Sequence, residues 1–239
     1  MERFRFKQFS VSHHRSAMKV GTDAVLLGTL APVRQNCEKI LDVGTGCGII
    51  ALMLAQRSSS RVDAIDIDAP SVAEARENFR QSPWSSRLNA INVSFQHFAG
   101  NIESSYDLIV SNPPFFQNSL LPVNERLSLA KHNHQLDFKS FIGSSDKLLT
   151  PRGLIAIILP VYEADQFLER AVSMNFYLMH CYSIIPVTDK NPNRKVMLFS
   201  REKPENQVFS EITLRMHSGE FSKEYRQLTT DFHPDEYFC

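Results

Sequence analysis

Residues 41–55 read LDVGTGCGIIALMLA, in which an apolar segment runs into three alternating glycines and then into a second apolar segment. Gly44, Gly46 and Gly48 stand where a strand would turn into a helix. Such a turn takes positive φ angles, and the missing side chains let a ligand approach the backbone closely. An α/β sheet binds its ligand at this place, outside the carboxyl end of a strand. The segment therefore predicts an α/β fold with a ligand site at the glycine turn.

The sequence on either side extends this pattern into a sheet. Short apolar runs alternate with stretches of helical periodicity, which predicts parallel strands joined by crossover helices. The expected strands are 39–43, 61–67, 91–95, 106–111 and 154–159, followed by a hairpin of 177–186 and 196–202. The expected helices are 49–58, 69–81, 138–149 and 163–174. We predict a doubly wound, mostly parallel sheet of seven strands with an antiparallel edge hairpin.

The length allows one large domain with a leading appendage. A chain of 239 residues fits a single α/β domain. Residues 1–36 are expected to form an arm and a helix that covers the ligand site, with Thr22 or Asp23 capping the helix. Residues 37–239 are expected to form the sheet domain.

Composition excludes several classes of protein. Hydrophobic residues make up 43% of the chain and charged residues 22%, which fits a globular protein with a sizeable core. No apolar run approaches the roughly 18 residues of a membrane span, and no signal peptide is visible, so we expect a cytoplasmic protein without membrane contact. The four cysteines are dispersed, which indicates neither disulfides nor a zinc site. Basic and acidic residues balance at 26 each, although 1–20 and 187–203 are locally basic.

An acidic residue completes the ligand site. Asp66 ends the second strand, where its carboxylate can accept hydrogen bonds from a ribose diol. The dinucleotide fingerprint would need a glycine at position 49, which is Ile49, so an NAD enzyme is disfavoured. Together the glycines and Asp66 indicate a site for a nucleoside.

The pattern D-x-G-x-G-x-G with an acid after the next strand resembles the cofactor motif of class I methyltransferases, which have a Rossmann-like fold and use S-adenosylmethionine (SAM). The resemblance implies that Asp42 lies near the methionine amino group and Asp66 on the ribose. It also implies cofactor contacts for the glycines, Thr45 and Ile67. Many members carry an acid after the third strand that touches adenine. Phe98 stands there, with Gln96 or His97 as substitutes, so adenine would be held by stacking and backbone groups.

The fourth strand ends in Asn112-Pro113-Pro114-Phe115. Paired prolines stiffen a loop and leave carbonyl groups free to accept hydrogen bonds. The Asn112 side-chain oxygen and the Pro113 carbonyl could draw the N–H groups of an exocyclic amine toward tetrahedral geometry while Phe115 stacks on its ring. The tetrapeptide resembles the amino-methyltransferase motif shared by adenine-N6, cytosine-N4, some guanine-N2 and glutamine-N5 enzymes. Asn112 is also expected to contact the cofactor.

Several other segments resemble the bacterial tRNA(Val) adenine-N6-methyltransferase family. They include MKVGTDAVLLG at residues 18–28, LAKHNHQLDF at 129–138 and YRQLTTDF at 225–232. The resemblance implies methylation of adenine 37 in the anticodon loop. It places Lys19, Gly21, Thr22 and Asp23 over the cofactor and acceptor. Ribosomal RNA guanine-N2 and protein glutamine-N5 methyltransferases remain alternatives, as does an inactive module that binds SAM or RNA.

If the substrate is RNA, the two basic segments are candidates for phosphate binding. Lys and Arg neutralise phosphates, and aromatic side chains stack on unpaired bases. The candidate RNA-binding residues are Arg3, Arg5, Lys7, Arg15, Phe116, Arg194 and Lys195. Phe4, Phe6 and Phe9 either stack on RNA or join the core. The histidines indicate no metal site, no obligate protein partner is evident, and the long loop after Phe116 is a candidate lid.

Overall fold

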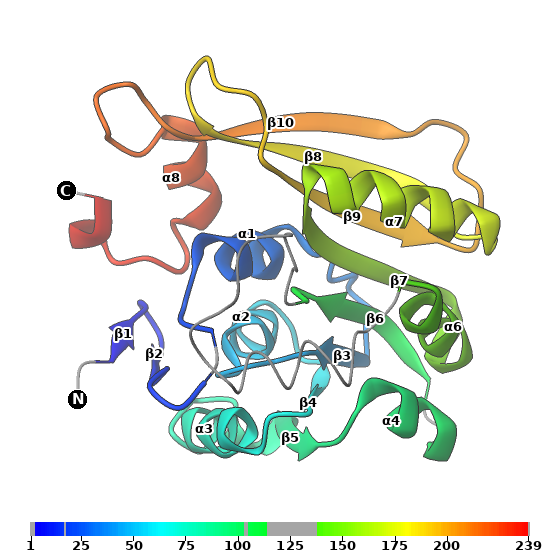
Figure 1. Ribbon diagram of the computed structural model, residues 1–239. Helices are drawn as coiled ribbons and strands as arrows, with labels where there is room; N and C mark the ends of the chain where they lie inside the picture. The colour runs from blue at the N-terminus through cyan, green and yellow to red at the C-terminus, as the bar shows by residue number, and fades with distance from the viewer. Residues whose placement is uncertain (1–2, 17, 103–104, 114–137, 239) are drawn as a thin grey trace, which may run out of the picture.

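An eight-stranded sheet crosses the protein in the order β10-β8-β9-β7-β6-β3-β4-β5 (Figure 1). The strands are β3 (Lys39–Val43), β4 (Arg61–Asp66), β5 (Leu88–Asn92), β6 (Tyr106–Ser111), β7 (Leu149–Pro160), β8 (Tyr177–Val187), β9 (Arg194–Ser200) and β10 (Val208–Arg215). β9 is antiparallel to β7 and β8, and the other neighbouring pairs are parallel. This computed structural model describes residues 3–16, 18–102, 105–113 and 138–238.

Helices cover both faces of the sheet, as a doubly wound fold requires (Figure 1). The helices are α1 (Thr22–Leu30), α2 (Ile49–Arg57), α3 (Ala69–Arg80), α4 (Phe95–Asn101), α6 (Phe138–Leu148), α7 (Val161–Ser173) and α8 (Lys223–Thr229). Residues of α1, α2, α3 and α8 share one hydrophobic core, and residues of α4, α6 and α7 share the other. The sheet separates these two cores.

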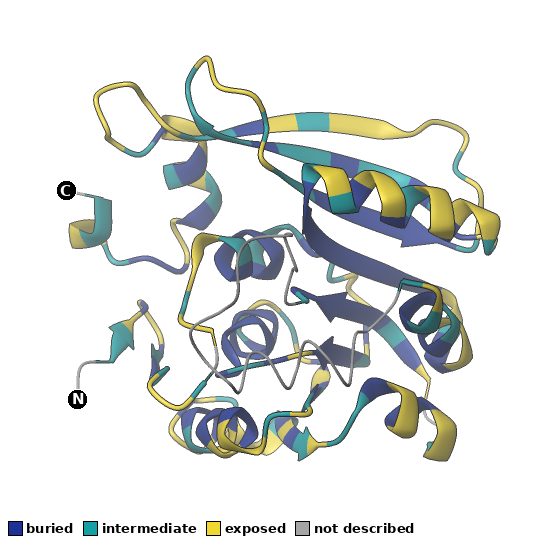
Figure 2. Cartoon of the chain, in the orientation of Figure 1, coloured by how far each residue is buried: buried dark blue, intermediate teal, exposed yellow. Residues whose placement is uncertain are grey.

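Burial explains the composition of the helices (Figure 2). α7 has one apolar face, where Ala164, Phe167 and Ala171 are buried at helical spacing. α2 is buried over residues 49–55 because α1 packs over it, and its sequence is apolar all round. The glycine turn leads directly into α2, so the burial of this helix fixes the position of the turn.

The predicted fold class is confirmed, with corrections at the edges. The sheet has eight strands because β10 adds to β8 beyond the expected hairpin. The third strand ends at Asn92, and the segment beginning at Phe95 is helix α4. β7 begins at Leu149, five residues before the expected start of this strand, and runs through Pro151 and Gly153. Thr22 and Asp23 do not cap α1: its N-cap is Gly21, which makes no side-chain bond. The division of the chain at residue 36 stays a prediction.

The N-terminal segment folds as a hairpin that a C-terminal segment covers. β1 (Phe4–Arg5) pairs with β2 (Ser10–Val11), and Phe6 and Phe9 are buried, so these two phenylalanines join the core rather than face RNA. His233 is fully buried and stacks on Tyr237 at 3.6 Å between ring centroids. Burial lowers the pKa of His233 to about 4, so its ring packs as a neutral aromatic.

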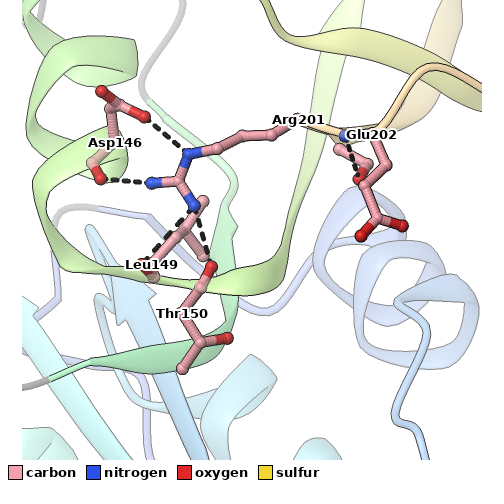
Figure 3. Close-up of polar contacts among 6 residues, drawn as sticks. Asp146, Leu149, Thr150, Arg201 and Glu202 are labelled. Atoms are coloured by element: carbon pink, nitrogen blue, oxygen red, sulfur yellow. Dashed lines mark hydrogen bonds and ion pairs between the residues drawn. The ribbon is translucent and has the colours of Figure 1, made fainter.

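One arginine fastens the far end of the sheet. Arg201 follows β9, and its Nε donates to the Asp146 carboxylate at 2.7 Å (Figure 3). Its Nη1 donates to the Thr150 carbonyl at 2.8 Å, and its Nη2 donates to the Asp146 carbonyl. The guanidinium therefore joins the end of β9 to α6 and to the beginning of β7.

Candidate functional site

The glycine turn between β3 and α2 has the backbone that the sequence predicts. Gly44, Gly46 and Gly48 have φ angles of 74°, 56° and 85°, a region that other residues rarely adopt. The Gly44 and Thr45 amides donate to the Ile65 carbonyl at 2.9 and 3.0 Å, which anchors the turn to the end of β4. A Cβ at Gly44 or Gly46 would meet no atom within 4 Å, so these glycines leave open space beside the backbone.

Gly48 serves packing instead. A Cβ at this position would lie 2.5 Å from Phe79 Cε1 and 3.2 Å from Ala75 Cβ, both on α3. The third glycine of the motif therefore permits α3 to approach the turn, whereas the first two leave room on its outer side.

Asp42 lies buried beneath the turn. Its Oδ2 accepts a hydrogen bond from Thr45 Oγ1 at 2.6 Å, and its Oδ1 has no hydrogen-bond partner in the described part of the chain. Burial raises the pKa of Asp42 to about 7, although the bond from Thr45 favours the ionised form. A carboxylate in this state is ready for a cationic partner, which would restore its negative charge.

Asp66 ends β4 beside the turn, as predicted. Its Oδ2 accepts from the Gly46 amide and its Oδ1 from the Asp68 amide, both at 2.9 Å. Burial raises the pKa of Asp66, and this effect outweighs the two hydrogen bonds, which lower it. Each oxygen retains a further lone pair, so the carboxylate is oriented by the backbone and can still accept from a hydroxyl group. Asp68 caps α3 by accepting a hydrogen bond from the Ser71 amide, so its carboxylate is occupied by the helix.

Asn112 follows β6 at the same end of the sheet. The Ser111 hydroxyl donates to the Val43 carbonyl at 2.8 Å, which ties the end of β6 to the end of β3. Asn112 is 8% exposed, and its Oδ1 has no hydrogen-bond partner among the residues that the structure describes. An unsatisfied buried oxygen is costly, so its presence here points to a ligand that donates to it. Pro113 is half-buried; Pro114, Phe115 and Phe116 lie outside the described residues.

Two residues of α3 that the sequence analysis missed hold residues 12–16. The Glu74 carboxylate accepts from the backbone amides of His14, Arg15 and Ser16 and from the Ser16 hydroxyl. Asn78 exchanges two hydrogen bonds with the Ser12 backbone. One signal was present in the sequence, because these polar side chains occupy core-facing helical positions.

The basic candidates are distributed between ion pairs and the surface. Arg194 pairs with Asp23 at 3.0 Å, and Lys195 pairs with Asp165 at 2.5 Å. The structure thus joins a predicted cofactor residue, Asp23, to a predicted RNA residue. Arg3 donates to the Ser10 carbonyl, Lys7 Nζ lies 3.4 Å from Asp235, and Arg5 and Arg15 are exposed.

The remaining cofactor candidates differ in exposure. Lys19, Gly21 and Thr22 are exposed at the entry to α1, and Ile67 is 42% exposed after β4. Phe98 is 3% exposed and packs in the core near Tyr106, so the structure gives its ring no open face for adenine. Its role at the cofactor, like that of the other candidates, stays a prediction.

The residues present fit a cofactor with a ribose and a charged amino group. The open space at two glycines, the oriented Asp66 carboxylate and the unpartnered Asp42 oxygen lie at one edge of the sheet. Within the described ranges, no group of three or more metal-ligating side chains occurs and no helix is long and apolar enough to cross a membrane.

Comparison with known sequences identifies relatives along almost the whole chain. Residues 12–171 match the family described as the methyltransferase small domain. A protein of Aeromonas salmonicida is 41% identical over 232 residues, with 96% of each chain covered, and carries the name tRNA1(Val) (adenine(37)-N6)-methyltransferase. A protein of Phocaeicola vulgatus with the same name is 40% identical, covering 96% of this chain and 97% of its own length.

Comparison with solved structures identifies the same architecture. A predicted O-methyltransferase of Agrobacterium tumefaciens has a TM-score of 0.69 at 16% identity and covers 88% of this chain and 96% of its own. A methyltransferase of Pyrococcus furiosus has a TM-score of 0.58 at 20% identity and covers 81% and 89%. At these identities the likeness establishes the fold alone.

Proposed function

The chain belongs to the tRNA1(Val) (adenine(37)-N6)-methyltransferase family, and on this premise we propose that it transfers a methyl group from SAM to N6 of adenine 37 in the anticodon loop of tRNA(Val). The observation that carries the chemistry is Asn112, whose buried Oδ1 has no partner and stands at the end of β6 beside the glycine turn. The substrate follows from the relatives, whose names state both the tRNA and the atom.

Asn112 acts on the amine of the acceptor. An exocyclic amino group is a poor nucleophile because its lone pair is delocalised into the base. Hydrogen bonds from its two N–H groups to Asn112 Oδ1 and to the Pro113 carbonyl localise that lone pair on nitrogen and fix its direction. Such oriented acceptors lower the barrier through positioning and electrostatics, so no strong general base is required.

The glycine turn and its acids hold the cofactor. SAM supplies a methyl group on a sulfonium, already a good electrophile. Asp66 accepts from the ribose hydroxyls, and Gly44 and Gly46 let the ligand lie against the backbone. Asp42 lies where its free oxygen can receive the amino group, directly or through water. Thr45 keeps the Asp42 carboxylate oriented through their 2.6 Å bond.

The tRNA would approach the same edge of the sheet. Arg194 and Lys195 begin β9, and their strand partners Pro160 and Leu159 end β7, which lies next to β6. Neighbouring strands are about 4.8 Å apart and a strand rises about 3.3 Å per residue, so the backbones of Lys195 and Arg194, which lie level with residues two and three positions beyond the partner of Ser111, stand roughly 12 and 14 Å from the end of β6. An unpaired anticodon loop can release its adenine from the stack at small cost. A tRNA substrate also favours the cytoplasm as the site of action.

The test is a methylation assay followed by nucleoside analysis. The purified protein is incubated with radiolabelled SAM and with tRNA lacking native modification. We expect N6-methyladenosine at position 37 of tRNA(Val). Label in ribosomal RNA or in protein would show that the acceptor is wrong while the amino chemistry survives. Binding of SAM without any transfer would favour the inactive module.

A further inference from the structure

Residues 12–16 lie between β2 and α1 in the chain and are bonded to buried side chains of α3, and we call them the crossing segment. Its backbone is fixed by side chains rather than by a strand partner. The Glu74 carboxylate accepts from the amides of His14 at 2.7 Å, Arg15 at 3.1 Å and Ser16 at 2.9 Å, and from the Ser16 hydroxyl at 2.7 Å. Three successive amides that converge on one carboxylate fix the path of the chain.

Asn78 joins the crossing segment to the glycine turn. Its Nδ2 donates to the Ser12 carbonyl and to the Cys47 carbonyl, each at 2.8 Å, while its Oδ1 accepts from the Ser12 amide at 2.9 Å. One amide group thus bridges the segment and the turn. Asn78 is 1% exposed, so this bridge is shielded from water.

A further hydrogen bond links the crossing segment to the residues that lead into α1. Beyond the crossing segment, the Val20 amide donates to His13 Nδ1 at 2.9 Å, which ties the entry to α1 back to residue 13. Lys19 and Gly21 flank that amide. The crossing segment is therefore bonded to α3 through Glu74 and Asn78 and to the entry of α1 through His13.

Glu74 is suited to this task because it stays ionised. Burial alone would raise its pKa, but the hydrogen bonds from Ser16, Arg15 and His14 leave the pKa of Glu74 below its ordinary value. A neutral glutamine could not replace it, because an amide nitrogen cannot accept from an N–H group.

We propose that Glu74 and Asn78 are positioning residues for the cofactor, which hold the crossing segment against the glycine turn as the outer wall of the site. This proposal rests on the proposed function, because it assumes that the cofactor lies at that turn. The two residues act through the backbone of residues 12–16 and need not touch the cofactor.

The first measurement is backbone amide exchange in the full chain without ligand. In Glu74→Gln we expect the amides of residues 14–16 to exchange about 100-fold faster than in the wild type, since the lost bonds are charge-assisted. Glu77→Gln is the matched control, because Glu77 lies on the same helix and, among the described residues, its carboxylate accepts from Arg80 and Gln81 of that helix and from no residue of the crossing segment. We expect wild-type exchange there.

The second measurement is calorimetric affinity for S-adenosylhomocysteine, with kinetics alongside. We expect Glu74→Gln to weaken binding and to raise KM for SAM about 10-fold, with little change in KM for tRNA. Glu74→Asp, which keeps the charge on a shorter side chain, should recover part of the affinity, and Glu77→Gln should bind as the wild type does. Asn78→Asp gives a second variant if Glu74→Gln does not fold.

The outcomes separate the two proposals. If exchange at residues 14–16 rises while affinity stays at the wild-type value, the contacts are merely structural and the inference is overturned. An equal loss of affinity in Glu77→Gln would also overturn it. If the wild-type protein itself binds no S-adenosylhomocysteine, the proposed function fails first, and the amide exchange still reports what Glu74 holds.

Discussion

The two ends of the sheet treat their polar groups differently. At the amino end, the Asp107 carboxylate accepts from the amides of Glu38 and Lys39 and from the Thr150 hydroxyl, and Arg201 is bound on three sides. At the carboxyl end, Asp42 and Asn112 each keep one buried oxygen without a partner.

This difference separates stability from function within one sheet. Satisfied buried polar groups fix the structure, whereas an unsatisfied one costs free energy that only a suitable ligand can return. Substitutions at the amino end should therefore lower stability and leave the chemistry intact. Substitutions at the carboxyl end should lower cofactor binding or methyl transfer more than they lower stability.

The largest effect is expected at Asn112. Asn112→Ala removes an acceptor for the amine, so kcat for methyl transfer should fall about 10²–10³-fold. The affinity for S-adenosylhomocysteine and the unfolding temperature should change little. Single-turnover kinetics and calorimetry measure both. Ser111→Ala is the control, because that hydroxyl joins two strands; full activity in Asn112→Ala would refute the proposed chemistry.

Within the glycine turn, one glycine is expected to affect mainly stability and another mainly cofactor binding. Gly48→Ala places a Cβ 2.5 Å from Phe79, so we expect it to cost about 3 kcal/mol of unfolding free energy. Gly44→Ala meets no atom within 4 Å and should cost about 1–2 kcal/mol through its φ angle alone. Cofactor binding should nevertheless fall further in Gly44→Ala. Chemical denaturation and calorimetry would show whether stability and binding separate in this way.

Arg201 tests the amino end. Arg201→Ala leaves the Asp146 carboxylate and two carbonyl groups without their donor, which should cost about 2 kcal/mol of unfolding free energy. KM for SAM and kcat should remain within about twofold of the wild type. A large loss of kcat at a temperature where the variant is folded would show that the two ends are not independent.

The smallest effect concerns pH. The pKa of Asp42 is raised to about 7 in the free protein, so below pH 7 the cofactor's amino group must drive off a proton to gain its carboxylate partner. Affinity should rise with pH, by at most about tenfold per unit, and level off above pH 7. Calorimetry in buffers of different ionisation enthalpy would detect the released proton. Asp42→Asn should abolish this dependence; an unchanged profile would exclude Asp42 as its source.

The same group predicts the pH dependence of folding. In the unfolded chain Asp42 has its ordinary, lower pKa, so the folded protein holds a proton that the unfolded chain releases. The free protein should therefore lose stability as the pH rises from about 4 to about 7, through this group alone.

Central strands could be predicted from the sequence almost to the residue. β3 and β6 lie in the centre of the sheet and are buried along most of their length, so they are short, mostly apolar segments with clear ends. The edge strand β10 was missed because it is half exposed and mixes polar with apolar residues. The start of β7 was missed because its proline and glycine suggested a turn.

The site divides in the same way. Asp42, Asp66 and Asn112 could be predicted to lie at one edge of the sheet because each belongs to a motif at a strand end, where local sequence carries the signal; their roles stay predictions. Glu74 could not be assigned a partner, since the amides that it binds lie about sixty positions earlier. The pair of Asp23 with Arg194 joins residues farther apart still. Such contacts follow from the fold and have no local signature.

The hairpin at the start of the chain has a consequence for the order of synthesis. Its Phe6 stacks on His233 at 5.4 Å between ring centroids, and the Lys7 amide donates to the Phe232 carbonyl at 2.7 Å. The ribosome synthesises the hairpin before it synthesises the segment around His233 that packs over it. Until the residues around His233 leave the ribosome, the hairpin therefore lacks this packing partner and Phe6 stays partly exposed. Completion of the core around this hairpin is thus coupled to translation of residues more than 220 positions later.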